Sequence, residues 1–370
     1  MSKLFLRQSL LGELLETLRL FGELVGPIRS QQGVTVFGPV NTATDLCLDY
    51  HRTLIPPKKC LLPFREKVVS FSGDGYHKGG DEPVRTVLFA IHPCDLEGIA
   101  YLDRVFLADP ADPGYARRRS GLTLVGISCE PDDFCFCAET QEAAPCDLFL
   151  TRVEGGFEIT VSTPRGEEIA AAARGCLTVY QTSQETAPSK GNPPQFPFIK
   201  GRTGVEIAIG GSVDPELRFS TNPLWEKFAE RCVGCGACSV CCPTCYCFDV
   251  REYPELSGGH TRMREWDNCL FKGHGEVAGG NFRLERLERL RYRFLHKFCG
   301  FSPLEGESSC VGCGRCREVC PVDIDLRELL PGHSFSPPPP PVEESPRPPG
   351  EGGRRPGEGG FNGKASEEGP

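Results

Sequence analysis

Two stretches near the end of the chain decide its fold: Cys232-Val-Gly-Cys235-Gly-Ala-Cys238-Ser-Val-Cys241-Cys242-Pro243 and Cys310-Val-Gly-Cys313-Gly-Arg-Cys316-Arg-Glu-Val-Cys320-Pro321. Both contain the spacing C-x2-C-x2-C-x3-C-P. A cubane metal cluster needs four thiolates at the corners of a tetrahedron. Three can come from a tight loop whose glycines let the backbone wrap the cluster. The fourth follows on a helical turn, and proline then redirects the chain. The two stretches therefore predict two sites of the same kind.

This spacing is that of bacterial ferredoxins with two [4Fe–4S] clusters, in which the fourth cysteine of each run ligates the other cluster. We therefore expect cluster 1 to use Cys232, Cys235, Cys238 and Cys320, and cluster 2 to use Cys310, Cys313, Cys316 and Cys242. Such crossed ligands join segments about eighty residues apart, so this part of the chain is expected to fold only with its metal. A pair of zinc sites is the alternative, although zinc favours two separated C-x2-C pairs.

The composition of the whole chain narrows the classes of protein that remain. The chain has 370 residues, 21 cysteines and a formal net charge of −9, and 39% of its residues are hydrophobic. This length predicts two or three domains. The acidic balance argues against nucleic-acid binding, which needs a basic surface. No stretch approaches 18 consecutive apolar residues, so we expect no membrane span.

The N-terminal residues 1–27 are rich in apolar side chains but carry Glu13, Glu16 and Glu23 at helical spacing. This pattern predicts an amphipathic helix and not a signal peptide, because no small-residue cleavage site follows. Without export, the protein is expected in the cytoplasm, where disulfides do not persist. The cysteines must then serve metal binding, reactivity or burial.

Residues 1–220 alternate short apolar runs with turn signals and predict an α/β-type domain. Strands are expected at residues 34–37, 67–71, 86–91 and 122–127, with weaker candidates at 157–161 and 205–209. Residues 95–107 keep their apolar side chains on one face and predict a helix. The segment 181–203 is rich in Pro, Ser, Gly and Thr and predicts a loop.

Residues 221–330 predict a ferredoxin-like domain with a helical insertion, so the expected fold class of the chain is α+β. The insertion contains an amphipathic helix over residues 283–298, whose other face carries Arg283, Arg286, Arg289, Arg291, Arg293 and Lys297. These basic residues could raise the potential of a nearby cluster, dock an acidic partner, or form a solvated face. Residues 331–370 are rich in Pro and Gly and predict a disordered tail.

A third group of cysteines follows two of the predicted strands. Cys94 starts the helix after strand 86–91, and Cys129, Cys135 and Cys137 follow strand 122–127. The carboxyl ends of neighbouring parallel strands meet at one edge of a sheet, so the four thiols are expected together. An extended Cys-Phe-Cys segment would also leave both of its thiols on one side.

These four cysteines form a candidate third [4Fe–4S] site or a structural zinc site. They could instead be small apolar residues of the core, and Cys146 could replace one of them. Cys241, Cys245, Cys247, Cys269 and Cys299 are expected to pack around the clusters, with ligation of another site as the alternative. Buried thiols suit the three isolated cysteines, Cys47, Cys60 and Cys176.

A series of motifs in fixed order gives the chain a family resemblance over roughly residues 30–330. The motifs are His92-Pro-Cys-Asp-Leu96, Tyr115-Ala-Arg-Arg118, Cys129 with Cys135-Phe-Cys137, Cys242-Pro-Thr-Cys-Tyr-Cys-Phe-Asp249, Arg264-Glu-Trp-Asp-Asn-Cys269, Arg293 to Phe298 and Cys310 to Cys316. They resemble the iron–sulfur β subunit of soluble cytoplasmic [NiFe] hydrogenases (sulfhydrogenases) and the related A subunit of anaerobic sulfite reductase. His92, Cys299 and Gly279-Gly-Asn-Phe282 depart from the family pattern and leave the eight ferredoxin cysteines unchanged.

The resemblance implies an electron-transfer subunit of a cytoplasmic oxidoreductase complex. Its expected partners are a flavin subunit that handles NAD(P)H and a [NiFe] hydrogenase subunit, or a sirohaem subunit if the chain is instead the A subunit of an anaerobic sulfite reductase. The sequence has no Gly-x-Gly-x-x-Gly after a strand, no Walker A lysine and no His-Glu-x-x-His, so we expect no catalytic residue in this chain. The alternatives from other classes are a stand-alone metal- or flavin-dependent reductase and a zinc-bound assembly or regulatory protein.

Overall fold

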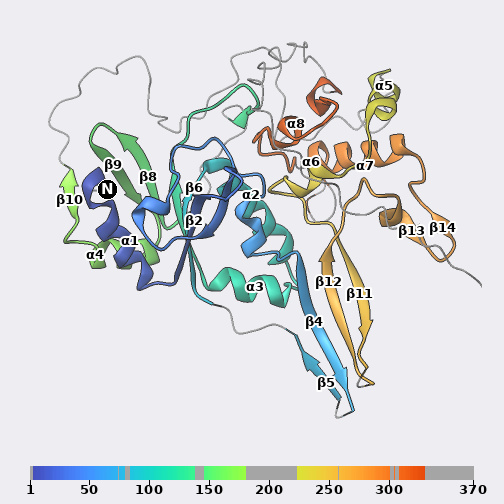
Figure 1. Cartoon of the computed structure of the whole chain (residues 1–370), viewed down its shortest axis with the longest axis horizontal. Coiled ribbons are helices and arrows are strands. Elements are labelled where there is room, and N and C mark those ends of the chain that lie inside the picture. The colour runs from blue at the N-terminus through green and yellow to red at the C-terminus, as the bar shows by residue number, and fades with distance from the viewer. Residues whose placement is uncertain are drawn as a thin grey trace, which may run out of the picture. The chain divides into compact units, whose positions relative to one another are not determined.

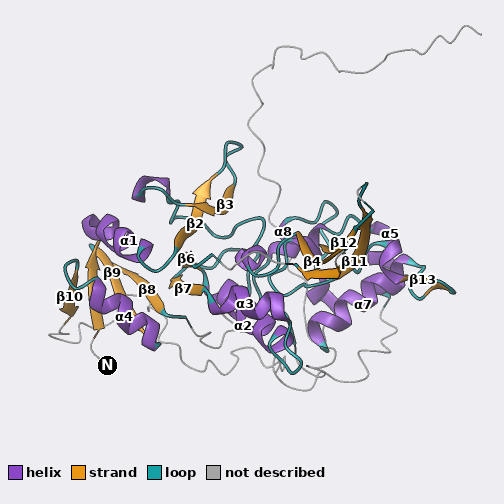
Figure 2. Ribbon diagram, turned by 90° about the horizontal axis from the view of Figure 1, so that it is seen from below, coloured by secondary structure: helices purple, strands orange, loops and turns teal. Residues whose placement is uncertain are grey.

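The computed structural model describes residues 3–73, 75–79, 84–137, 146–180, 223–256, 258–300, 304 and 308–329, all of which lie in one compact unit, Met1–His333. It combines helices and sheets, so the predicted α+β class is confirmed (Figures 1 and 2). The predicted strand 205–209, the loop 181–203 and the tail 331–370 lie outside the described residues. Among the described helices, none is both long and apolar enough to cross a membrane.

An eight-stranded sheet forms the N-terminal part, in the order β10-β1-β9-β8-β7-β6-β2-β3. The strands are β1 (Lys3–Arg7), β2 (Glu23–Arg29), β3 (Thr35–Pro39), β6 (Thr86–Ile91), β7 (Leu122–Ile127), β8 (Leu148–Val153), β9 (Gly156–Val161) and β10 (Leu177–Tyr180). Strands β2, β6, β7 and β8 are parallel neighbours. Every residue of β7 is buried, as expected for a central parallel strand, and β6 and β7 have the predicted bounds.

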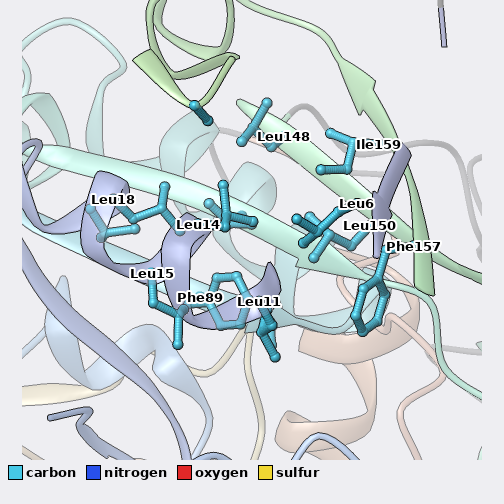
Figure 3. Close-up of a cluster of buried hydrophobic side chains, with 14 of the residues drawn as sticks. Leu6, Leu11, Leu14, Leu15, Leu18, Phe89, Leu148, Leu150, Phe157 and Ile159 are labelled. Carbon is cyan, nitrogen blue, oxygen red and sulfur yellow. The ribbon is translucent and has the colours of Figure 1, made fainter. Parts of the chain in front are cut away.

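The N-terminal segment differs from the helix predicted for residues 1–27, which is wrong in extent. Only α1 (Leu11–Arg19) is an α-helix, after a short 3-10 turn at Gln8–Leu10. The residues before and after it form β1 and β2, because β1 pairs with both β9 and β10, and the Gly-Pro pair inside β2 disfavours helix. Within α1, four leucines face the sheet and pack into its core (Figure 3).

Three more helices, α2 (Pro93–Phe106), α3 (Pro113–Ser120) and α4 (Pro164–Ala172), accompany this sheet. The core on the α1 side contains Leu14, Phe89 and Leu150 (Figure 3). A second core on the α2 side contains Leu102 and Tyr115. Because α2 begins directly after β6, the start of this helix lies at the carboxyl edge of the parallel strands.

A second sheet connects the N-terminal part to the cysteine-rich part. Its strands are β11 (Phe248–Pro254), β12 (His260–Trp266), β4 (Arg65–Ser72) and β5 (Gly75–Lys78), in that order. The predicted strand 67–71 therefore belongs to β4 in this sheet and not to the eight-stranded one. Arg264 on β12 forms ion pairs with Glu66 on β4 and with Asp112.

The cysteine-rich module, residues 223–329, is built mainly from short elements. It contains α5 (Leu224–Arg231), α6 (Ala237–Val240), α7 (Arg286–Phe298), α8 (Arg315–Glu318), strands β13 (Glu276–Val277) and β14 (Gly280–Asn281), and short 3-10 turns. Helix α7 is the predicted helical insertion, and it begins three residues later than expected. Helices α6 and α8 have only four residues each, and each carries one cysteine of the ferredoxin-type pattern.

Candidate metal centre

The chain forms the two cysteine loops around left-handed glycines. Gly236 and Gly314 precede α6 and α8 with φ of 74° and 73°. A Cβ at Gly236 would lie 2.2 Å from the Asn268 side-chain nitrogen, and one at Gly314 would lie 2.4 Å from the Phe134 carbonyl oxygen. Both positions therefore require glycine, for backbone conformation and for space.

The first cavity lies between the loop before α6 and the end of the second cysteine run. Its cysteines are Cys232, Cys235, Cys238, Cys316 and Cys320. Four of these five are the thiols predicted to hold cluster 1. Cys235 is exposed and its neighbour Val233 is 58% exposed, so this cavity lies near the surface.

The second cavity lies between the loop before α8, helix α7 and the end of the first cysteine run. Its cysteines are Cys242, Cys310, Cys313 and Cys316. These are the four thiols predicted to hold cluster 2. Cys316 lines both cavities. Each cavity thus receives its fourth predicted thiol from the other cysteine run, and the ligand assignment itself stays a prediction.

The donor set of both cavities fits an iron–sulfur cluster. Cysteine thiolates are the soft ligands that such clusters use. In the described part of the chain, no three Cys, His, Asp or Glu side chains converge closely enough to hold a single metal ion. The thiols surround spaces instead of meeting at a point.

Burial changes the protonation of these thiols. It raises the pKa of Cys310 to about 12, and it raises the pKa of Cys313 and of Cys238 above the ordinary value. Cys242 differs, because a hydrogen bond from Cys245 and the nearby Lys297 ammonium lower its pKa. Metal binding needs thiolates. Binding of metal by the thiols whose pKa is raised must therefore release protons.

The third group of cysteines meets at the carboxyl edge of β6 and β7, as the strand order predicted. Cys94, Cys135 and Cys137 pack together with Val311 and Cys313. The thiols of Cys137 and Cys135 are hydrogen-bonded, and burial together with the nearby Cys135 raises the pKa of Cys129 to about 11. This group therefore lies directly against the loop of the second cysteine run.

Two details of the third group differ from the prediction. Residues 135 and 136 are not in a strand, and the Phe136 amide instead donates a 2.8 Å hydrogen bond to the Gly312 carbonyl. Cys146, the alternative fourth member, lies in the hydrophobic core beside α2 and α3. The structure thus brings Cys94, Cys129, Cys135 and Cys137 together, and metal binding by them stays a prediction.

A buried ion pair joins the third group to the second cysteine run, and sequence reasoning missed it. Asp95 is 0% exposed and Arg315 is 1% exposed, and both guanidinium nitrogens lie 2.8 Å from the carboxylate oxygens. Arg315 also donates to the Thr53 carbonyl at 2.8 Å. Asp95 follows Cys94, and Arg315 precedes Cys316. A charged residue beside each cysteine was the available signal.

Helix α7 carries two buried cations, although the sequence pattern predicted both of them on the polar face of the helix. Arg293 is 2% exposed and Lys297 is 4% exposed, whereas Arg286 is exposed. The sequence pattern groups all the basic residues on one face. It does not show that these two are buried. Another buried cation, Lys58, donates a 2.7 Å hydrogen bond to the Cys245 carbonyl and lies over the Trp266 ring.

The cysteines outside the ferredoxin-type pattern are mostly buried. Cys241, Cys245, Cys269 and Cys299 are buried, and Cys247 is half-buried. Cys247 and Cys269 share a hydrogen bond, which lowers the pKa of Cys269 to about 6, with Arg293 contributing. Of the isolated cysteines, Cys176 is buried and Cys47 and Cys60 are half-buried.

Comparison with known proteins identifies the cysteine-rich part. Residues 231–324 match the family described as a 4Fe-4S dicluster domain, which implies two [4Fe–4S] clusters. The chain is 36% identical over 332 residues to the sulfhydrogenase 2 subunit beta of Pyrococcus furiosus, covering 86% of this chain and 94% of that protein. It is 26% identical over 118 residues to the F420-dependent formate dehydrogenase subunit beta of Methanocaldococcus jannaschii, covering 31% and 23%. No solved structure matches.

Proposed function

Because the chain belongs to the family of the sulfhydrogenase 2 subunit beta, we propose that it is the electron-transfer subunit of a hydrogenase complex. The observation that carries this proposal is the grouping of eight cysteines around two cavities inside a 4Fe-4S dicluster domain. When bound there, [4Fe–4S] clusters supply one-electron carriers. The residues of this chain hold them, bury them and control the charge around them.

The ligands of the two clusters follow from the cavities and from the spacing. The first cavity would use Cys232, Cys235, Cys238 and Cys320, and the second would use Cys242, Cys310, Cys313 and Cys316. Although Cys316 lines both cavities, the spacing assigns it to the second. The exposure of Cys235 and Val233 makes the first cavity the side on which a partner would approach.

The proposed partners are a subunit that binds flavin and NAD(P)H and a catalytic [NiFe] subunit, and the proposed compartment is the cytoplasm. The support is the family membership, since the sulfhydrogenase relative is named as one subunit of a hydrogenase. The A subunit of an anaerobic sulfite reductase is the alternative from the motif resemblance. Neither of the two relatives named above is a sulfite reductase.

We also propose a third [4Fe–4S] cluster at Cys94, Cys129, Cys135 and Cys137. The support is that these thiols come from separate segments and meet at one sheet edge, packed against Cys313 of the second cavity. A carrier at this place would be next to the second cavity, which in turn shares Cys316 with the first. Its order in the relay would therefore be third site, second cavity, first cavity.

The test is the iron content of the full chain purified without oxygen. Two clusters give about eight irons per chain and three give about twelve. Cys137→Ser is expected to lower the content by about four irons, whereas the control Cys146→Ser, in the hydrophobic core, is expected to leave it unchanged. A folded, iron-free chain would overturn the whole proposal. An unchanged iron content in the Cys137 variant would overturn the third cluster alone.

A further inference from the structure

Helix α7 points two of its basic side chains into the module. Arg293 and Lys297 are four residues apart, so they lie on the same face of the helix. Both are nearly inaccessible to solvent, whereas Arg286, near the start of the same helix, is exposed. A solvated basic face is therefore not the role of these two residues.

Their positions relate directly to the cysteine-lined cavities. Arg293 lines both cavities, and Lys297 lines the second. Arg293 Nη2 donates to the Cys238 carbonyl at 2.6 Å, and Nη1 lies 3.3 Å from Cys245 Sγ. Lys297 Nζ donates to Thr244 Oγ1 at 2.8 Å, and this hydroxyl lies 3.4 Å from Cys242 Sγ.

Neither cation has a carboxylate beside it in the part of the chain that the structure describes. Within those residues, no carboxylate lies within ion-pair distance of Arg293 or Lys297, and Arg293 Nε has no hydrogen-bond partner although it is buried. The contrast is Arg315, equally buried, which holds Asp95 with two hydrogen bonds. A buried charge without a counter-charge is strongly unfavourable. The two cations of α7 therefore require negative charge within the cavities that they line.

We propose that Arg293 and Lys297 set the reduction potentials of the two clusters, with Arg293 acting on both and Lys297 mainly on the one in the second cavity. This inference rests on the proposed function. A cluster with four thiolate ligands is anionic, and reduction adds one more negative charge. A cation at short range in a poorly solvated interior stabilises the reduced state more than the oxidised state, and it thus raises the potential.

The experiment compares variants of the full chain, purified without oxygen, in a redox titration followed by EPR. Arg293→Met is expected to lower the equilibrium constant for reduction of each cluster about tenfold. For a one-electron couple, this change equals a reduction potential lower by 59 mV. Lys297→Met is expected to lower the equilibrium of the second-cavity cluster more than that of the first. Cys313→Ser identifies which signal belongs to the second cavity.

Two control variants separate charge from structure. Arg286→Met removes the same charge from the exposed part of the same helix, and we expect both equilibria to stay within about twofold. Arg293→Lys keeps the charge and is expected to retain potentials near those of the unmodified chain. If Arg293→Met loses its iron while Arg293→Lys keeps it, the requirement for a positive charge is supported.

Three results would overturn the inference. Equal potentials in the Arg293→Met and Arg286→Met proteins, with both clusters present, would show that the buried charge has no effect. Unchanged potentials in the Lys297→Met protein would show that the charge of Lys297 has no effect either. Loss of iron in both Arg293→Met and Arg293→Lys would show that charge is not what the position supplies. A cluster-free unmodified chain would instead refute the proposed function, and it would be detected before any variant is made.

Discussion

The eight-stranded sheet and the cysteine-rich module have different kinds of interior. The sheet is packed on one side by leucines of α1 and on the other by α2 and α3, and residues such as Leu14 and Phe89 are fully buried. The module has four-residue helices, two cavities lined by thiols, and buried cations beside those cavities. Burial of apolar surface stabilises the first region, whereas the second depends on what fills its cavities.

The two regions are nevertheless joined by specific contacts. The Asp95–Arg315 pair connects the start of α2 with α8, and β12 pairs with β4 across the second sheet. The comparison therefore predicts graded effects: loss of metal acts first on the module, and loss of apolar packing acts first on the sheet.

Removal of iron by an anaerobic chelator is expected to have the largest effect. Amides of residues 237–242 and 315–320 should lose their protection from hydrogen exchange, because crossed ligands no longer hold the module together. Amides of β6 and β7 should keep theirs. Hydrogen-exchange mass spectrometry measures both sets in one sample. Equal loss of protection in the two regions would contradict the comparison.

Asp95→Asn is expected to lower the free energy of unfolding by about 3–5 kcal/mol, because it leaves the buried Arg315 without its anionic partner. The control is Asp249→Asn, which breaks a pair with Arg251 at exposed positions and should leave the free energy of unfolding nearly unchanged. Urea unfolding of the iron-loaded proteins measures both. Similar costs for the two variants would show that the buried pair is not a link between the regions.

Leu14→Ala tests the sheet without touching the module. Leu14 is fully buried, so its truncation is expected to cost about 2–5 kcal/mol. The iron content and the EPR signals of the folded protein should not change, since this leucine packs against β-sheet residues and not against the cavities. A loss of clusters in the folded variant would mean that the two regions are coupled more tightly than their contacts indicate.

A pair of glycine substitutions is expected to have the smallest effects. The two glycines have nearly the same backbone conformation, so each variant is a control for the other. Gly155 and Gly314 both have left-handed backbones, with φ of 78° and 73°. Gly155 has open space around it, so Gly155→Ala should cost only the conformational strain, about 1–2 kcal/mol. Gly314→Ala adds a clash with the Phe134 carbonyl and should cost more and lower iron binding. Equal costs in thermal unfolding would refute a tight packing of the 134–137 loop on the module.

The sequence predicted the parts of the molecule that depend on local pattern. The spacing of the cysteines indicated two groups, and the apolar runs at 86–91 and 122–127 matched β6 and β7, because buried parallel strands are apolar along their whole length. The same strands placed Cys94 and Cys129 at one sheet edge. Comparison with known proteins then confirmed the dicluster domain.

What the sequence could not predict depends on contacts between distant segments. The N-terminal leucines suggested one long helix, whereas pairing of β1 with β9 and β10 limits that helix to residues 11–19. Arg293 and Lys297 could not be distinguished from the other basic residues of α7, since only the cavities show which ones are buried. The Asp95–Arg315 pair spans 220 positions, and a charged residue beside each cysteine does not show which two residues pair.

EPR of four serine variants shows whether the ligands of the two clusters are crossed between the two cysteine runs. Cys313→Ser and Cys242→Ser are expected to remove the same signal, although the two residues belong to different cysteine runs. Cys235→Ser and Cys320→Ser are expected to remove the other signal. If Cys242→Ser instead removes the signal that Cys235→Ser removes, each run binds its own cluster, and the crossed arrangement is contradicted.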